Sequence, residues 1–251
     1  MKYDITIIIP TRDRYNGLTY LVKSINDLAN KPRKIEIIMR VDDDDKVGLE
    51  AISDLEAANL EVALVKVIKP RNEYLSDLWD ECYELASADR IMACADDCIF
   101  RTKDWDLTIV AASPNPDKVV YFMYGNDTIQ KNFLATFPIV SRAWVECAGF
   151  FMPRGYKRDW CDTHLHDIAI RLKKEHRINL LTLGWYFKDI IFEHQHPAHK
   201  RQFKYDQTYS DRLKMPCEKK QYDARTAERS KIATRIAEYI KFKKVPKGAK
   251  L

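Results

Sequence analysis

Short apolar runs alternate with helical stripes over the first part of the chain, and this alternation constrains the fold more than any other feature. Between the runs, apolar residues recur at the three- and four-residue spacing of amphipathic helices. A β-branched run without polar alternation is typical of a strand buried on both faces. We therefore predict an α/β fold with a Rossmann-like, mostly parallel central sheet flanked by helices. The predicted strands are Ile5–Ile9, Ile35–Val41, Val62–Ile68 and Arg90–Ala95.

After Asp106 the alternation loosens. The expected strands there are Val119–Tyr124, Leu180–Leu183 and Ile190–Phe192, and the expected helices are Ser141–Cys147, Leu165–Leu172 and Ile232–Ile240. Ser141 is a favourable N-cap for the first of these helices. We expect one domain over residues 1–197, with halves at 1–106 and 107–197. A basic, partly helical extension would follow at 198–251.

The composition favours a packed globule, since 46% of the residues are hydrophobic and 11% are aromatic. No apolar run approaches the roughly 20 residues that a membrane helix needs, and none resembles a signal peptide. We expect a cytoplasmic protein without a transmembrane segment. The six cysteines form no CxxC pair, so we expect free thiols packed as small apolar groups.

The formal charge of +5 is unevenly distributed. Residues 198–251 hold 16 Lys and Arg against 6 Asp and Glu, while the rest of the chain holds 26 against 31. A basic extension on a mildly acidic body suggests an anionic partner, such as nucleic acid, a membrane surface or a phosphorylated acceptor. A solvated helical face that aids solubility is the alternative.

Polar clusters follow the first, second and fourth predicted strands, where parallel sheets bind their ligands. The first cluster consists of Pro10, Thr11, Arg12, Asp13 and Arg14. The guanidinium groups of Arg12 and Arg14 suit contacts with a phosphate or a nucleotide base. A surface turn with solvated arginines is the alternative.

The second cluster is the run of four carboxylates from Asp42 to Asp45. Adjacent carboxylates repel one another unless something uses them. Asp42 and Asp43 lie closest to the strand end, so we expect them to accept hydrogen bonds from a base or a ribose. The other two would cap the helix that begins near Lys46. An acidic, solvated turn is the alternative.

The third cluster is Asp96-Asp97, after the fourth strand. Two carboxylates at the end of an apolar strand are costly unless they are paired or hold a cation. Mg²⁺ and Mn²⁺ prefer such hard oxygen ligands and bridge carboxylates to a diphosphate. A pair of turn or helix caps is the alternative.

The order and spacing of the clusters carry a resemblance. ITIIIPTRDR, RVDDDD and RIMACADDCIF with the following DWD resemble inverting glycosyltransferases of the large "family 2" type, which have the GT-A fold. The resemblance covers roughly Tyr3 to Pro197. It implies transfer of a sugar from a nucleotide sugar, namely a UDP-sugar, to an acceptor hydroxyl with inversion, aided by Mn²⁺ or Mg²⁺. The expected acceptor is a glycan, a lipid-linked molecule or a small molecule. Residues 1–106 would bind the nucleotide sugar and 107–197 the acceptor.

By the same resemblance, Asp42 binds the base, Asp97 binds the metal with Asp96 beside it, and His194 is a late metal ligand. His196 is the other histidine of FEHQHP. The chain departs from the family in two places. Cys98 stands where a metal motif commonly has a second Asp, and Asp80 stands where an asparagine is frequent.

The acceptor half would supply the general base that deprotonates the acceptor hydroxyl. The resemblance places it after a Gly-aromatic segment, which here begins at Gly149. Asp162 fits that position best, with Asp159 and Asp167 as rivals and a plain N-cap as the alternative role for Asp162.

Aromatic and histidine residues nearby add acceptor candidates. Trp160 is the best candidate for stacking on a sugar, and we expect core packing for most of Trp105, Trp144 and Trp185. His164 and His166 are expected at the surface or in the acceptor site.

Three other functions fit parts of the sequence. The basic extension favours a transferase acting on modified bases of DNA, for which binding would weaken with salt. Cys98 favours a non-catalytic nucleotide-sugar binding module. A nucleotidyltransferase would need a glycine-rich phosphate loop after the first strand, which Gly17 alone does not supply.

Overall fold

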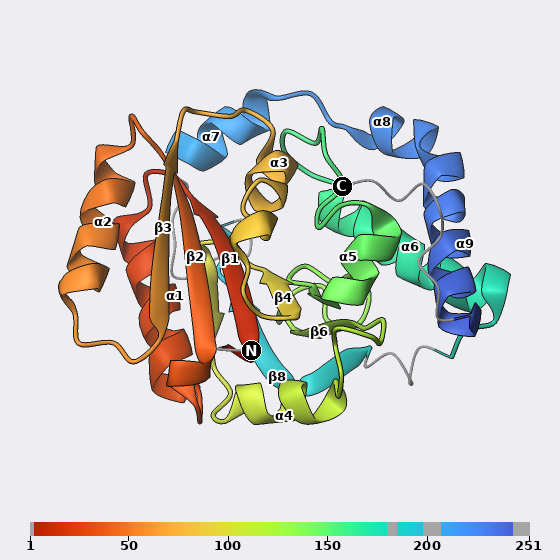
Figure 1. Cartoon of the computed structure of the whole chain (residues 1–251). Coiled ribbons are helices and arrows are strands. Elements are labelled where there is room, and N and C mark those ends of the chain that lie inside the picture. The colour runs from red at the N-terminus through yellow and green to blue at the C-terminus, as the bar shows by residue number, and fades with distance from the viewer. Residues whose placement is uncertain (1–2, 180–184, 198–206, 243–251) are drawn as a thin grey trace.

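The computed structural model describes residues 3–179, 185–197 and 207–242 (Figure 1). Within these ranges the strands form one eight-stranded sheet in the order β3-β2-β1-β4-β7-β6-β8-β5. The strands are β1 Ile5–Thr11, β2 Ile35–Asp42, β3 Ala63–Lys69, β4 Arg90–Ala93, β5 Cys98–Phe100, β6 Phe122–Asn126, β7 Ile139–Ser141 and β8 Tyr186–His194. This is the α/β architecture that the sequence predicts.

The first half of the sheet is parallel, as expected. β1 pairs with β2 and β4, and β2 pairs with β3, all in parallel. The connecting helices are α1 Tyr15–Leu28, α2 Lys46–Ala57 and α3 Leu75–Asp80. The carboxyl ends of β1, β2 and β4 therefore lie at one edge, which brings the three polar clusters of the sequence together.

The second half is mixed, which explains why its pattern is harder to interpret. β7 runs antiparallel to β4 and β6, and β5 runs antiparallel to β8. β5, β7 and the helix α4 Trp105–Ala112 are short, and the sequence analysis missed them. The strand expected at Ile190–Phe192 is the middle of the longer β8. The strand expected at Leu180–Leu183 lies outside the described residues.

Two hydrophobic cores cover opposite faces of the sheet. Alternation along β1 sends Ile7 and Ile9 into the core beneath α1 and α2, and Ile8 into the core beneath α3, α5 and α6. All three side chains are fully buried. Each such burial stabilises the fold by about 1.5–3 kcal/mol relative to exposure. This is why Ile7, Ile8 and Ile9 are apolar in succession rather than at alternate positions.

The helices of the second half begin and end at identifiable signals. They are α5 Arg142–Ala148 and α6 Cys161–His176. Ser141 caps α5 as predicted, by accepting a hydrogen bond from the Trp144 N–H, and Gly149 ends it at φ 84°. α6 ends with basic residues in its last turn, which its dipole favours.

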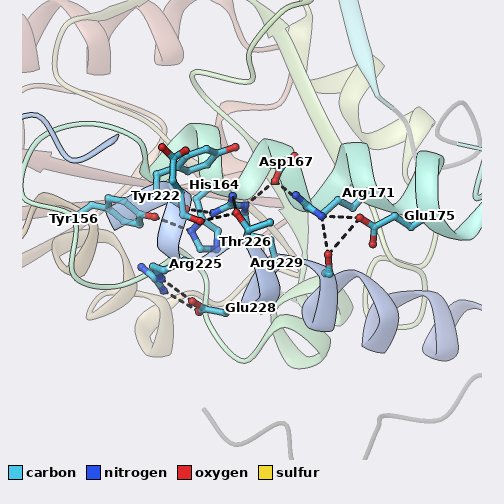
Figure 2. Close-up of polar contacts among 12 residues, drawn as sticks. Tyr156, His164, Asp167, Arg171, Glu175, Tyr222, Arg225, Thr226, Glu228 and Arg229 are labelled. Atoms are coloured by element: carbon cyan, nitrogen blue, oxygen red, sulfur yellow. Dashed lines mark hydrogen bonds and ion pairs between the residues drawn. The ribbon is translucent and has the colours of Figure 1, made fainter. Parts of the chain in front are cut away.

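The C-terminal segment contains α7 Gln207–Lys214, α8 Lys219–Ala224 and α9 Thr226–Phe242. α9 lies beside α6 and α5 (Figure 1), and its apolar face, including Ile232 and Ile236, is part of the core. Figure 2 shows the polar contacts along this junction. The buried Arg229 donates to Asp167 at 2.6 Å and to the Tyr222 carbonyl at 2.6 Å. Residues 207–242 are therefore packed onto the sheet domain.

Several expectations about single side chains can be compared with their burial. His164 and His166 are 0% and 3% exposed, so the expectation of a surface position is wrong. Both are held inside, since His164 Nδ1 lies 2.9 Å from the Tyr156 hydroxyl and His166 Nδ1 accepts from the Ala135 N–H. Free cysteines are confirmed, with five of the six buried. Trp105 and Trp144 are core residues as predicted.

None of the described helices is long and apolar enough to cross a membrane.

Candidate active site

A cavity of about 520 Å³ opens at the carboxyl ends of β1, β2 and β4. This volume lies in the range of small-molecule sites. Its wall includes the segments after these strands and also the loop before α6, the end of β8 and the chain between α7 and α8. Among the predicted site residues it is lined by Pro10, Thr11, Arg12, Arg14, Asp42, Asp96, Asp97, Trp160, Asp162 and His194.

Asp96 is fixed by the segment after β1. Thr11 Oγ1 donates to its Oδ2 at 2.9 Å, and Arg14 Nη1 donates to its Oδ1 at 2.9 Å. Burial raises the pKa of Asp96 to about 6, although the Arg14 charge opposes this effect. The helix α1 approaches this turn closely, because a Cβ at Gly17 would lie 2.4 Å from the Asp96 carbonyl oxygen. Gly17 thus serves close packing here.

Asp97 lies beside Asp96 and is 3% exposed. Its Oδ2 lies 3.4 Å from His194 Nε2 and 3.4 Å from Arg14 Nη1, and it accepts a hydrogen bond from the Tyr209 hydroxyl. Burial alone would raise the pKa of Asp97, but His194, Arg14 and Tyr209 lower it well below its usual range. Burial lowers the pKa of His194, and Asp97 more than reverses this, so the pKa of His194 is raised.

The residues around Asp97 suit a divalent cation that takes further ligands from a diphosphate and water. Within the described ranges, no three His, Cys, Asp or Glu side chains form a complete metal cluster. However, Oδ1 of Asp97 is buried and has no hydrogen-bond partner among the described residues. Mg²⁺ commonly binds through one or two carboxylates and substrate phosphates, and Oδ1 of Asp97 fits this pattern. The nearby imidazole of His194, when neutral, suits Mn²⁺ as a further ligand better than Mg²⁺.

The end of β2 carries a second set of paired charges. Asp42 accepts from Arg12 at 2.7 Å and also from the buried guanidinium of Arg40. Arg12 additionally bridges to the exposed Asp44 at 2.6 Å. The Asp44 and Asp42 carboxylates hold the pKa of Arg12 above its ordinary value. A nucleotide base that reaches this corner would therefore meet an oriented carboxylate and an oriented guanidinium.

The four carboxylates after β2 have separate positions. Asp45 caps α2 by accepting from the Gly48 N–H at 3.0 Å, which confirms the predicted capping role for Asp45. The cap expected from Asp44 is wrong, since Asp44 pairs with Arg12 instead. Asp43 is exposed and does not line the described cavity. Of the two predicted base-binding residues, Asp42 is therefore at the cavity and Asp43 is beside it.

The candidate bases lie at different places along α6. Asp162, in the first turn, lines the cavity, and its pKa is raised by burial. Its Oδ1 accepts from the Thr163 N–H at 2.6 Å. Asp159 also lines the cavity and pairs with Arg158 at 2.7 Å. Asp167 lies away from the described cavity and pairs with Arg171 and Arg229 (Figure 2).

The loop from Gly149 to Trp160 contributes part of the cavity wall. Trp160 lines it, whereas Gly149 ends α5 and is not part of the described lining. Asp80 accepts hydrogen bonds from the Phe151 N–H at 2.7 Å and from Arg154. Asp80 thus holds this loop and does not line the described cavity.

The C-terminal segment brings residues to the site that the sequence pattern did not predict. Tyr209 of α7 contacts Asp97, and its ring lies 4.2 Å from the Arg14 guanidinium carbon and 5.1 Å from the His196 ring. Met215 lines the cavity. Both belong to a polar stretch without a motif, so no signal in the sequence pointed to them. His196 lies next to His194 at the cavity wall.

No protein-family model and no curated protein matches this sequence. Solved structures do match in fold. The mannosyltransferase PcManGT from Pyrobaculum calidifontis, solved in complex with GDP-Man and Mn²⁺, aligns with a TM-score of 0.59 at 12% identity, over 96% of this chain and 76% of that one. S. aureus TarS 1–349 in complex with UDP aligns with a TM-score of 0.56 at 11% identity, over 96% and 92%.

A longer S. aureus TarS structure aligns with a TM-score of 0.58 at 11% identity. That alignment covers 75% of this chain and 36% of TarS, so the chain spans about a third of the longer protein. Sequence identities near this level establish fold and not activity. These alignments show that the chain has the GT-A fold.

Proposed function

We propose that this protein is a metal-dependent glycosyltransferase that moves a sugar from a nucleotide sugar, namely a UDP-sugar, to an acceptor hydroxyl with inversion. One observation carries the proposal. Paired carboxylates with an adjacent imidazole lie on one wall of the cavity, and a carboxylate with a raised pKa lies on another wall of the same cavity.

The charged residues at the ends of β1, β2 and β4 indicate where the nucleotide-sugar donor would bind. Asp97 and His194 would hold Mn²⁺ or Mg²⁺, and the bound cation would offset the negative charge that develops on the departing nucleotide diphosphate. Asp96, fixed by Thr11 and Arg14, would keep the neighbouring Asp97 in place. Arg12, Asp42 and Pro10 line the part of the cavity proposed for the nucleotide.

Residues in and just after the loop before α6 indicate where the acceptor would bind. Asp162 is proposed as the general base, because burial makes its carboxylate more basic at the cavity wall. Trp160 is proposed to contact the acceptor, since an aromatic face suits the apolar face of a sugar. Inversion requires a base on the acceptor side and no protein nucleophile, which agrees with these assignments.

A donor screen tests the proposal. Thermal shifts with UDP-glucose, UDP-N-acetylglucosamine and GDP-mannose, each with and without Mn²⁺, should show stabilisation by one nucleotide sugar that depends on the cation. Hydrolysis of that donor should then be lost in Asp162→Asn. Binding without turnover would leave the binding-module alternative, and no binding of any nucleotide sugar would sink the proposal. The identity of the acceptor, including DNA, stays a prediction.

A further inference from the structure

The loop that precedes α6 is held by a carboxylate from the C-terminal segment. Glu218 accepts hydrogen bonds from the backbone N–H groups of Lys157 at 2.6 Å, Arg158 at 2.9 Å and Asp159 at 3.0 Å. Three successive N–H groups thus converge on one side chain, which is 8% exposed. Such a concave arrangement of N–H groups stabilises an anion strongly.

The same loop is fixed from its other side by α3. Tyr156 N–H donates to the Ser76 hydroxyl at 2.9 Å, and Gly155 N–H donates to Asp77 at 2.8 Å. Glu218 therefore supplies the contacts for the part of the loop closest to α6. Glu218 itself does not line the described cavity, whereas Lys157, Arg158 and Asp159 do.

The chain leaves this loop through a residue in an uncommon conformation. Trp160 has φ 75°, in the left-handed region that bulky residues rarely adopt. Its ring lies 5.0 Å from that of Tyr222, which follows Glu218 in the same segment (Tyr222 is labelled in Figure 2). Such a conformation persists only where neighbouring groups hold it. Here Glu218 binds the backbone of the residues before Trp160, and the Tyr222 ring packs against the Trp160 ring.

We propose that Glu218 is a positioning residue for the acceptor side of the site. By binding three N–H groups of residues 157–159, it sets the backbone that leads into Trp160 and so the place of Asp162 in the first turn of α6. The inference rests on the proposed function. Glu218, from the C-terminal segment, would thus take part in the reaction without contacting the substrate.

Turnover of Glu218→Gln tests the proposal. An amide keeps the shape of the side chain but offers one accepting oxygen and turns an N–H₂ group toward at least one backbone N–H. Misplacement of a reacting group by about 1 Å can cost up to roughly a hundredfold in rate, so we expect kcat for donor hydrolysis to fall roughly ten- to a hundredfold. KM for the donor should stay within about twofold, because the groups proposed to hold the nucleotide are unchanged.

The probe is whichever of UDP-glucose, UDP-N-acetylglucosamine and GDP-mannose the wild type hydrolyses fastest with Mn²⁺. Asp223→Asn is the matched control, since Asp223 lies on α8 and makes an exposed ion pair with Lys219. It should match the wild type in kcat and KM. Hydrogen exchange of the amides of residues 157–159 should speed up in Glu218→Gln and not in the control.

The outcomes distinguish failure of the positioning role of Glu218 from failure of the proposed function. An unchanged kcat in Glu218→Gln, or a fall in apparent kcat no larger than the loss of folded protein, would overturn the positioning role. If the wild type turns over no nucleotide sugar, the proposed function fails. In that case, hydrogen exchange of residues 157–159 still tests whether Glu218 holds the loop. Unchanged exchange in Glu218→Gln would show that it does not.

Discussion

The Tyr209 hydroxyl donates a hydrogen bond to Oδ2 of Asp97, so a side chain from α7 contacts the carboxylate proposed to hold the cation. The same oxygen lies 3.4 Å from His194 Nε2. A cation bound between Asp97 and His194 through this oxygen, rather than through Oδ1 alone, would compete with Tyr209 for it. The contact therefore couples the position of α7 to the donor side of the cavity.

Tyr209→Phe should bind UDP with Mn²⁺ more tightly than the wild type. Removing the hydroxyl frees an oxygen of Asp97, and a hydrogen bond to a charged group is worth about 1.5–3 kcal/mol, so the gain should be at most roughly tenfold to a hundredfold. Titration calorimetry measures it. Tyr239→Phe is the control, because its hydroxyl contacts the remote Lys118 carbonyl at 3.0 Å. Weaker binding by Tyr209→Phe would mean that the hydroxyl supports the cation.

Asp97→Asn should abolish the dependence of donor binding on Mn²⁺. The amide has no charge to attract a cation, and we expect affinity for UDP with Mn²⁺ to fall at least about tenfold, or about 1.4 kcal/mol. Thermal shift against Mn²⁺ concentration measures this. Asp117→Asn is the matched control, since Asp117 lies 3.9 Å from the exposed Lys118 ammonium and outside the described cavity lining. Equal responses of both variants would argue against a cation at Asp97.

Asp162→Asn should keep donor binding and lose turnover. An asparagine cannot take a proton, and general-base catalysis typically contributes about 10²- to 10⁴-fold, so kcat should fall by that order while affinity for UDP with Mn²⁺ stays the same. Asp159→Asn is the comparison variant, because Asp159 shares the cavity wall but pairs with Arg158. A larger loss of kcat in Asp159→Asn would move the base to that residue.

Acid should destabilise the fold through two buried histidines. Burial lowers the pKa of His164 to about 3 and that of His166 to about 4, from an ordinary 6.5. Below pH 6.5 the unfolded chain binds protons that the folded chain does not, so stability falls as the pH is lowered from 6.5 toward these values. Between pH 8 and 5, each histidine should cost about 2 kcal/mol of unfolding free energy, most of it below pH 6.5.

Urea unfolding of the wild type and His164→Phe at pH 8, 6.5 and 5 measures this effect. The variant is less stable at pH 8 if the contact with the Tyr156 hydroxyl matters, but its loss of stability toward pH 5 should be smaller by about 2 kcal/mol. Equal losses in both proteins would show that His164 does not titrate on unfolding in this range.

The N-terminal strands and their polar ends could be predicted because their signals are local. Ile5–Ile9 and Ile35–Val41 read as buried strands, and parallel pairing then places Thr11, Asp42 and the Asp96 turn at one edge. Nothing in that step depends on distant parts of the chain. The prediction of a GT-A fold is accordingly confirmed by the structural alignments.

Only the tertiary structure decided which distant groups meet there. Tyr209 and Glu218 come from a stretch that reads as a polar extension, yet they contact Asp97 and the 157–159 loop. The α9 helix that follows them buries Ile232 and Ile236 in the core shared with α5 and α6. His164 looked like a surface residue, yet it is buried beside Tyr156. Periodicity in sequence reports which face of an element is apolar. It does not report which other element covers that face, because that depends on packing between segments far apart in the chain.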